Sequence, residues 1–284
     1  MLKKVLLTSA IIFSVIATAQ NKPAYKLYSK NGHKVSYKSM ISKMAKADVV
    51  LFGEYHNNPI VHWLELETTK ALHKKRTITL GAEMFEADNQ TELTHFIDGK
   101  IDEKALDTLA RLWSNYKTDY KPLVEFAKKN KLKFVATNIP RRYASMVYRG
   151  GFEVLETLSL EEKNWMMPLP VKYDASLPGY VKMKEMMGGH GGDNLPKAQA
   201  VKDATMAYFI LKNKKKDTLF LHFNGSYHSD DYEGIYWYLK QENPHLKIIT
   251  VSVIEQNDVK KFDKENKNKA DFMIVVPSEM TKTY

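Results

Sequence analysis

The chain has 284 residues, a formal net charge of +10 and no cysteine. Without cysteine it forms no disulfide bond, no thiolate metal site and no lipid anchor at a signal-peptide cysteine. The lysine-rich stretches at 212–216 and 260–269 are typical of solvated faces, and no nucleic-acid-binding motif accompanies them. We therefore expect no nucleic-acid partner and at most a mild preference for anionic ligands.

The first residues predict a secretory signal peptide. Lys3 and Lys4 precede an apolar run at 5–17, and Ala17-Thr18-Ala19 forms a small-x-small cleavage site before Gln20. The run is shorter than the about 20 apolar residues of a transmembrane helix. We expect residues 1–19 to be removed and residues 20–284 to act in the periplasm or as a secreted protein. Loss of the two lysines lowers the formal charge from +10 to +8.

The pattern after the signal peptide predicts an α/β fold. A hairpin is expected at 25–37 with its turn at Asn31-Gly32, followed by a short helix at 39–45. Continuous apolar runs, as buried parallel strands require, occur at 49–52, 78–80, 132–136, 219–223, 248–251 and 272–276. Helical patterns lie at 59–73, 122–129, 198–211 and 233–240. Strands alternating with helices predict a mostly parallel sheet flanked by helices.

Two stretches without a strand interrupt this alternation, at about 88–130 and about 141–202. The second is broken by prolines and by a glycine-rich segment at 188–192. We expect both to be helical insertions that pack together over one edge of the sheet as a smaller helical subdomain.

Polar residues follow the ends of four predicted strands, where ligands bind in open parallel sheets. Each of these residues could instead have a purely structural role. A glutamate could cap the start of a helix, a histidine could lie on the surface, and Arg141 could form an internal ion pair with Glu83 or Glu54. Their convergence nevertheless predicts a pocket. Its expected side chains are Glu54, His56, Glu83, Arg141 and His228.

These residue types allow two kinds of chemistry. Glu54, His56 and His228 are candidate ligands of a divalent metal. The whole group, with Glu83 and Arg141, would instead serve as the catalytic residues of a hydrolase in which a histidine acts as general base. The sequence lacks the GxSxG, GxGxxG, P-loop and HExxH motifs, which argues against serine hydrolysis and nucleotide binding. A metal site therefore depends on the expected geometry alone.

Motifs at these positions resemble those of the ChaN family. The segment 48–59 (DVVLFGEYHNNP) is similar to its opening motif, and 83–85 (EMF) to its second. Segments 122–127 and 138–141 resemble its middle blocks. Segment 199–207 (QAVKDATMA) is similar to its most recognisable helix, and 225–228 (GSYH) to its late glycine–histidine motif. The likeness runs in order from about residue 25 to 276.

The resemblance implies an exported haem-binding protein for haem or iron uptake or transfer. It also implies paired haems between two subunits, hence a homodimer on haem binding, and it makes an outer-membrane haem receptor a candidate partner. In that family picture a tyrosine coordinates the iron and a histidine contacts the propionates, which is sensible because phenolate is an accepted axial ligand of haem.

Tyr180 is the best local candidate for the iron ligand, since it opens a short helix whose methionines suit a flat porphyrin. His190 follows on the glycine-rich segment, and Tyr55 and Tyr227 lie within the pocket motifs. The alternative for Tyr180 is ordinary core packing. The same superfamily, with the Tiki proteins and erythromycin esterases, uses similar motifs for hydrolysis. A metal- or histidine-dependent esterase or peptidase therefore stays an open alternative.

Overall fold

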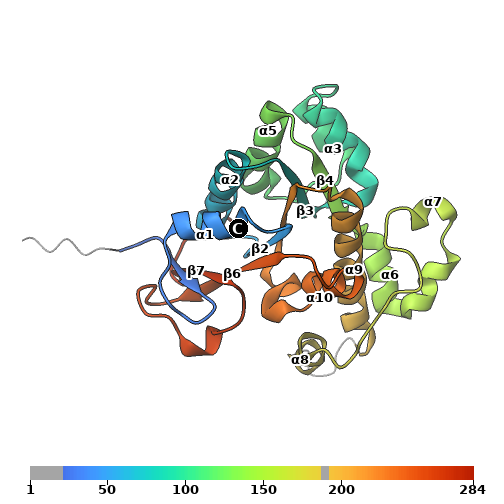
Figure 1. Ribbon diagram of the computed structural model, residues 1–284. Helices are drawn as coiled ribbons and strands as arrows, with labels where there is room; N and C mark the ends of the chain where they lie inside the picture. Colours follow the sequence, from blue (N-terminus) through green and yellow to red (C-terminus); the bar gives the residue numbers. More distant parts are fainter. Residues whose placement is uncertain (1–21, 187–191) are drawn as a thin grey trace, which may run out of the picture.

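The computed structural model describes residues 22–186 and 192–284, and these form a sheet covered by helices on both faces (Figure 1). The strand order is β1-β7-β6-β2-β5-β3-β4. All neighbours pair in parallel except β1, which runs antiparallel to β7. The strands are β1 (Lys26–Ser29), β2 (Val49–Glu54), β3 (Ile78–Glu86), β4 (Phe134–Asn138), β5 (Leu219–Gly225), β6 (Ile248–Gln256) and β7 (Phe272–Pro277). The predicted mostly parallel α/β fold is confirmed.

The central strands are buried on both faces because successive side chains point to opposite sides of a sheet. Val50 and Phe52 of β2 face one hydrophobic cluster, and Val49 and Leu51 face the other. The first cluster includes α1 (Tyr37–Met44), α2 (Pro59–His73), α3 (Gln90–Ile97), α4 (Glu103–Leu109) and α5 (Lys121–Asn130). The second includes α6 (Arg141–Gly150), α9 (Asn194–Asn213) and α10 (Ile235–Glu242).

The two predicted insertions are helical, but they do not form one unit. Helices α3 to α5 lie on one face of the sheet, whereas α6 and α9 lie on the other. Both groups flank the edge strand β4. The second stretch also contains α7 (Leu160–Lys163) and α8 (Pro178–Met186). Both stretches are thus helical and lie beside the same edge strand, as expected, but they cover opposite faces of the sheet and pack in separate hydrophobic clusters.

The predicted hairpin is present in a reduced form. β1 pairs with β7, and after the turn at Asn31-Gly32 the chain returns beside β1, with a bridge between Tyr28 and Lys34 and backbone hydrogen bonds from Ser29 to His33 and from Val35 to Leu27. Ser36 then caps α1 by accepting a hydrogen bond from the backbone N–H of Ser39. A strong N-cap starts a helix there instead of a second strand.

The predicted signal peptide lies outside the described residues. Among the residues that are described, no helix combines the length and apolar character needed to cross a bilayer.

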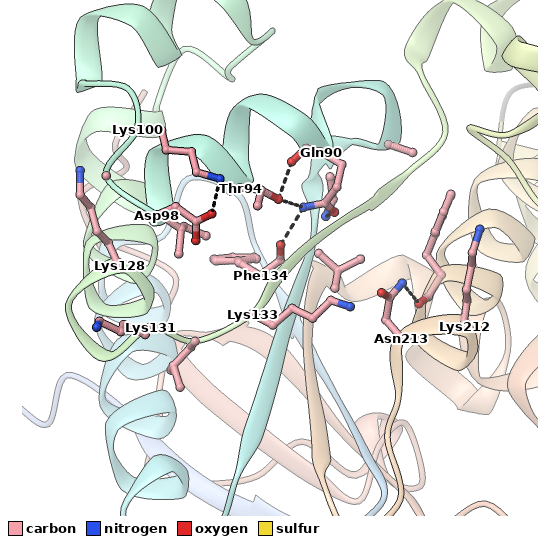
Figure 2. Close-up of a pocket in the computed structure, with 17 residues that line it drawn as sticks. Gln90, Thr94, Asp98, Lys100, Lys128, Lys131, Lys133, Phe134, Lys212 and Asn213 are labelled. Carbon is pink, nitrogen blue, oxygen red and sulfur yellow. Dashed lines mark hydrogen bonds and ion pairs between the residues drawn. The ribbon is translucent and has the colours of Figure 1, made fainter.

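The open edge of β4 is covered by the side chain of Gln90 (Figure 2). Its Nε2 donates to the carbonyl oxygen of Phe134 over 3.0 Å, and its Oε1 accepts from the N–H of Ala136 over 2.7 Å. One residue of an additional parallel strand would make the same two bonds. A groove of about 1120 Å³ surrounds this edge. Its rim carries Lys100, Lys128, Lys131, Lys133 and Lys212.

Candidate functional site

A pocket of about 640 Å³ lies where β2, β5 and β6 end, at the edge of the sheet that the sequence pattern indicates. Glu54, His56 and His228 line it. Glu83 lies directly behind, since its carboxylate contacts both His228 and the backbone of Gly225. The remaining lining comes from Tyr55, Asn57, Gln199, Gly225, Ser226, Tyr227, Glu255, Lys282 and Tyr284.

Glu54 and His56 form a hydrogen-bonded pair at the end of β2. The buried Glu54 Oε1 lies 2.7 Å from His56 Nδ1 and accepts a second bond of 2.7 Å from the hydroxyl of Tyr120. Tyr120 comes from the helical turn Tyr116–Tyr120 that precedes α5. Burial disfavours the charged form of His56, but the hydrogen bond to Glu54 and the nearby Glu83 raise its pKa. Carboxylates therefore orient His56 and favour its protonated form.

The ring of His56 packs against Gly225, where only a glycine leaves room. A Cβ atom at position 225 would lie 2.9 Å from His56 Nε2. Glycine thus brings the end of β5 close to the ring, and the backbone N–H of Gly225 donates to Glu83 Oε2 over 2.7 Å. This close approach joins the two strand ends into one site.

Behind the pocket, His228 is held between two buried carboxylates. Its Nε2 lies 3.1 Å from Glu83 Oε1, and its Nδ1 lies 2.5 Å from Asp203 Oδ1 on α9. Burial disfavours the imidazolium, but Glu83 and Asp203 outweigh burial and raise the pKa of His228 to about 10. The same contact holds the pKa of Glu83 well below its ordinary value, against the effect of burial.

His228 is therefore a cation at neutral pH, with both N–H groups used inside the protein. In this state neither ring nitrogen has a free lone pair, so His228 can neither coordinate a metal nor accept a proton. Of the three predicted metal ligands, Glu54, His56 and His228, Glu54 alone belongs to a group of three or more described side chains whose ligand atoms lie close enough together to hold an ion. Within the described residues, that group is Glu54, His62 and Glu65.

Arg141 lies apart from the other predicted residues. It opens α6 and lines a neighbouring pocket of about 550 Å³ together with Glu86, Arg111 and Trp113. The expected ion pair with Glu83 or Glu54 was wrong, because these carboxylates contact His228 and His56 instead. The two pockets share one lining residue, Tyr284.

The three candidate tyrosines differ in how accessible they are. Tyr180 is buried on α8, and its hydroxyl donates to Asp203 over 3.3 Å. Burial, and then Asp203, raise the pKa of Tyr180 far above its ordinary value. The side chain of Tyr227 is 44% exposed and donates to the carbonyl oxygen of Gly179 over 2.7 Å. Tyr55 is partly buried in the pocket lining. The predicted site residue His190 lies outside the described residues.

The sequence patterns alone missed the partners that hold the site in place. Asp203, within the 199–207 motif, fixes His228 from α9. Tyr120 fixes Glu54. His62 and Glu65 lie behind Glu54 on the inner side of α2. The signal that would have indicated them is the helical spacing of polar residues on a face that also carries buried Val61 and Leu64.

Two solved structures share this fold. ChaN of Campylobacter jejuni, whose structure is described as showing cofacial haem binding, superposes with a TM-score of 0.63 at 20% identity, covering 89% of this chain and 97% of that chain. A Bacillus cereus protein gives a TM-score of 0.52 at 13% identity, covering 89% and 95%. At such identities the likeness supports the fold.

A sequence comparison matches the chloroplastic protein RETICULATA-RELATED 5 of Arabidopsis thaliana, 27% identical over 126 residues. That match covers 42% of this chain and only 17% of the plant protein. The model of a family described as "Haem-binding uptake, Tiki superfamily, ChaN" matches residues 40–239, which is 200 of the 284 residues and includes the ends of β2 and β5 at the pocket. The chain therefore belongs to the ChaN family of the Tiki superfamily.

Proposed function

We propose that this chain is an exported haem-binding protein that acts in haem or iron uptake or transfer. Family membership supports haem as the ligand. The predicted signal peptide supports export, and with it an outer-membrane haem receptor as the partner that exchanges haem.

The observation that carries the proposal is a set of exposed apolar side chains in the pocket lining and on helix α8, which contacts the pocket residue Tyr227. Of the eight large hydrophobic side chains exposed in the described residues, Tyr227 and Tyr284 line the pocket, and Val181 and Met186 lie on α8. The hydrogen bond from Tyr227 to Gly179 ties α8 to the pocket. Exposed apolar surface concentrated in one region marks a binding site.

The side chains around this surface suit haem. Val181 and Met186 offer apolar contact to a flat porphyrin, and His56 and Lys282, which pairs with Glu255, carry N–H groups for propionates. Bound haem would supply a ferric iron, for which a phenolate is a suitable axial ligand. We infer that Tyr227 provides it ahead of Tyr180, because Tyr227 is exposed whereas Tyr180 is buried in the protein.

The same surface would explain a homodimer. Two chains that each present α8 and the pocket mouth would cover this apolar surface when haem lies between them. The cofacial arrangement described for the Campylobacter jejuni protein supports this picture.

The test is a hemin titration of the protein comprising residues 20–284, recorded by visible absorption, with the mass of the complex measured in parallel. We expect a saturable Soret shift and a doubled mass. Tyr227→Phe should remove the ferric phenolate bands. Tyr148→Phe is the matched control, because Tyr148 has a similar exposure of 43% but lies on α6. Absence of a saturable Soret shift would overturn the proposal, whereas loss of the bands in Tyr180→Phe or Tyr55→Phe alone would reassign the ligand.

The hydrolase alternative has weaker support. His228 is held as a cation with both N–H groups used inside the protein, which leaves His56 to exchange a proton with a substrate, and Glu54 and Glu83 favour the protonated form of His56. A screen with ester and peptide substrates tests this alternative. Activity that is lost in His56→Ala would support it, and activity that survives that change would exclude this pocket as its source.

A further inference from the structure

A second buried cluster lies behind Glu54, on the side facing α2. The side chains of Glu54 and Glu65 are fully buried, and that of His62 is 4% exposed. His62 Nδ1 lies 3.2 Å from Glu65 Oε2 and 3.6 Å from Glu54 Oε2. Two carboxylates and an imidazole thus face one another inside the protein, where unpaired charges are costly.

The hydrogen bond on the other side of the ring sets the orientation of His62. Its Nε2 lies 3.0 Å from the backbone carbonyl oxygen of His56, which can only accept, so Nε2 carries a hydrogen. Nδ1 therefore faces the carboxylate oxygens and needs either a proton or a cation between them. Metal-binding histidines typically have this arrangement, in which the second ring nitrogen donates to a carbonyl group.

The two carboxylates also have oxygen atoms that could accept further hydrogen bonds or bind an ion. Glu54 Oε2 and Glu65 Oε1 are buried and receive no hydrogen bond from an N–H or O–H group of the described residues, while the two carboxylates lie within hydrogen-bond reach of each other. The other oxygen of Glu54 is already fixed by Tyr120 and His56. A buried acceptor without a partner is rare, and a bound ion can supply the missing partner.

From this geometry we propose that Glu54, His62 and Glu65 bind a divalent transition-metal ion of the zinc type, a site separate from the proposed haem surface. The separations of 3.2 and 3.6 Å between ligand atoms are close to the about 3.3 Å edge of a tetrahedron with bonds of about 2.0 Å. Two carboxylates and one neutral imidazole would balance the double charge of the ion. The carboxylate and imidazole ligands are among those zinc uses.

The site also has a route to solvent. His62 lines a surface pocket of about 430 Å³ that also includes Asp119 and Trp63. On the opposite side, Glu54 lines the main pocket. Because Glu54 bridges the cluster and His56, a bound ion would fix the carboxylate that orients His56.

The test begins with protein of residues 20–284 that has been stripped with EDTA and dialysed, then titrated with Zn²⁺ by calorimetry and with Co²⁺ by visible absorption. We expect one equivalent to bind per chain, with the intense visible bands of four-coordinate Co²⁺. Glu65→Gln should weaken binding by at least about 100-fold, more than the 10–100-fold typical of losing a partner of a ligand. Glu67→Gln is the control, because Glu67 lies on the same helix but is exposed and pairs with Lys70.

Two results would overturn the proposal. One is wild-type protein that binds no Co²⁺ in a four-coordinate form, as expected if the carboxylates share a proton instead. The other is a zinc affinity that stays the same in both Glu65→Gln and His62→Gln. That result would mean that the ion binds elsewhere. If Glu65→Gln does not fold, the cobalt spectrum of the wild type and the zinc-dependent rise of its melting temperature still decide the question. Hemin binding is measured separately, so failure of either proposal leaves the other testable.

Discussion

Replacing Glu83 by glutamine removes one of the two carboxylates that hold the buried His228 imidazolium. Breaking a buried ion pair by deleting one partner typically costs about 3–5 kcal/mol. The pKa of about 10 gives a similar magnitude. It lies roughly 3–4 units above the ordinary value, which at about 1.4 kcal/mol per unit is a net stabilisation of the imidazolium by about 5 kcal/mol after the cost of burial. Glu83 makes the largest single electrostatic contribution to this pKa, so we expect Glu83→Gln to lower the free energy of unfolding by about 3 kcal/mol at pH 7.

The same contact predicts how stability depends on pH. In the unfolded chain the histidine loses its proton near pH 6.5, whereas folded His228 keeps it up to about pH 10. The folded state therefore binds more protons over this interval. The contribution to stability is complete below pH 6.5 and decreases as pH rises towards 10, by at most about 1.4 kcal/mol per pH unit. Glu83→Gln should flatten this decrease.

Urea unfolding followed by tryptophan fluorescence at pH 6.5, 8 and 9.5 measures both effects. Glu67→Gln is a suitable control, because a change in an exposed ion pair should alter stability by less than about 1 kcal/mol. The reasoning is refuted if Glu83→Gln stays within about 1 kcal/mol of the wild type at pH 7, or if the stability of the wild type and of the Glu67→Gln control does not fall more steeply between pH 6.5 and 9.5 than that of Glu83→Gln.

Three further predictions concern other parts of the fold. Gly225→Ala should displace His56, because the added methyl group would lie 2.9 Å from the ring. We expect urea unfolding to show a free energy of unfolding lower by about 1–3 kcal/mol, and unchanged stability would contradict this close contact. Burial lowers the pKa of His222 to about 4, so the folded protein favours the neutral form of this histidine. The free energy of unfolding of the wild type should therefore fall by up to about 3 kcal/mol as the pH falls from 6.5 to 4. His222→Gln should lose less over that range, and an equal loss would argue against a neutral His222. Gln90→Ala should cost about 1–3 kcal/mol and increase light scattering with concentration, whereas the exposed Gln241→Ala should do neither.

Much of the architecture follows from local patterns. The apolar run at 49–52 predicts a strand buried on both faces, and the structure has β2 at Val49–Glu54. Pro59 predicts the start of α2 because proline suits the first turn of a helix. The strand order was not predicted, since the apolar runs resemble one another and nothing local distinguishes their neighbours.

The candidate site was predictable where it follows strand ends and unpredictable where it depends on helices. Glu54, His56 and His228 meet because parallel strands end at one edge of the sheet. Arg141 also follows a strand, but it opens α6 and lines a different pocket. Asp203 lies in the middle of a helix, where its contact with His228 depends on how α9 packs against the sheet.

The amide of Gln90 bears on how copies of this protein can associate. It occupies the two backbone positions on β4 that a strand from another molecule would need. Growth of the sheet from one molecule into the next is therefore blocked at this edge by a single side chain, without a further strand. The haem-bound dimer proposed above would therefore not form by pairing of β4 with β4, and at this edge the two chains would be able to separate again without unzipping a shared sheet.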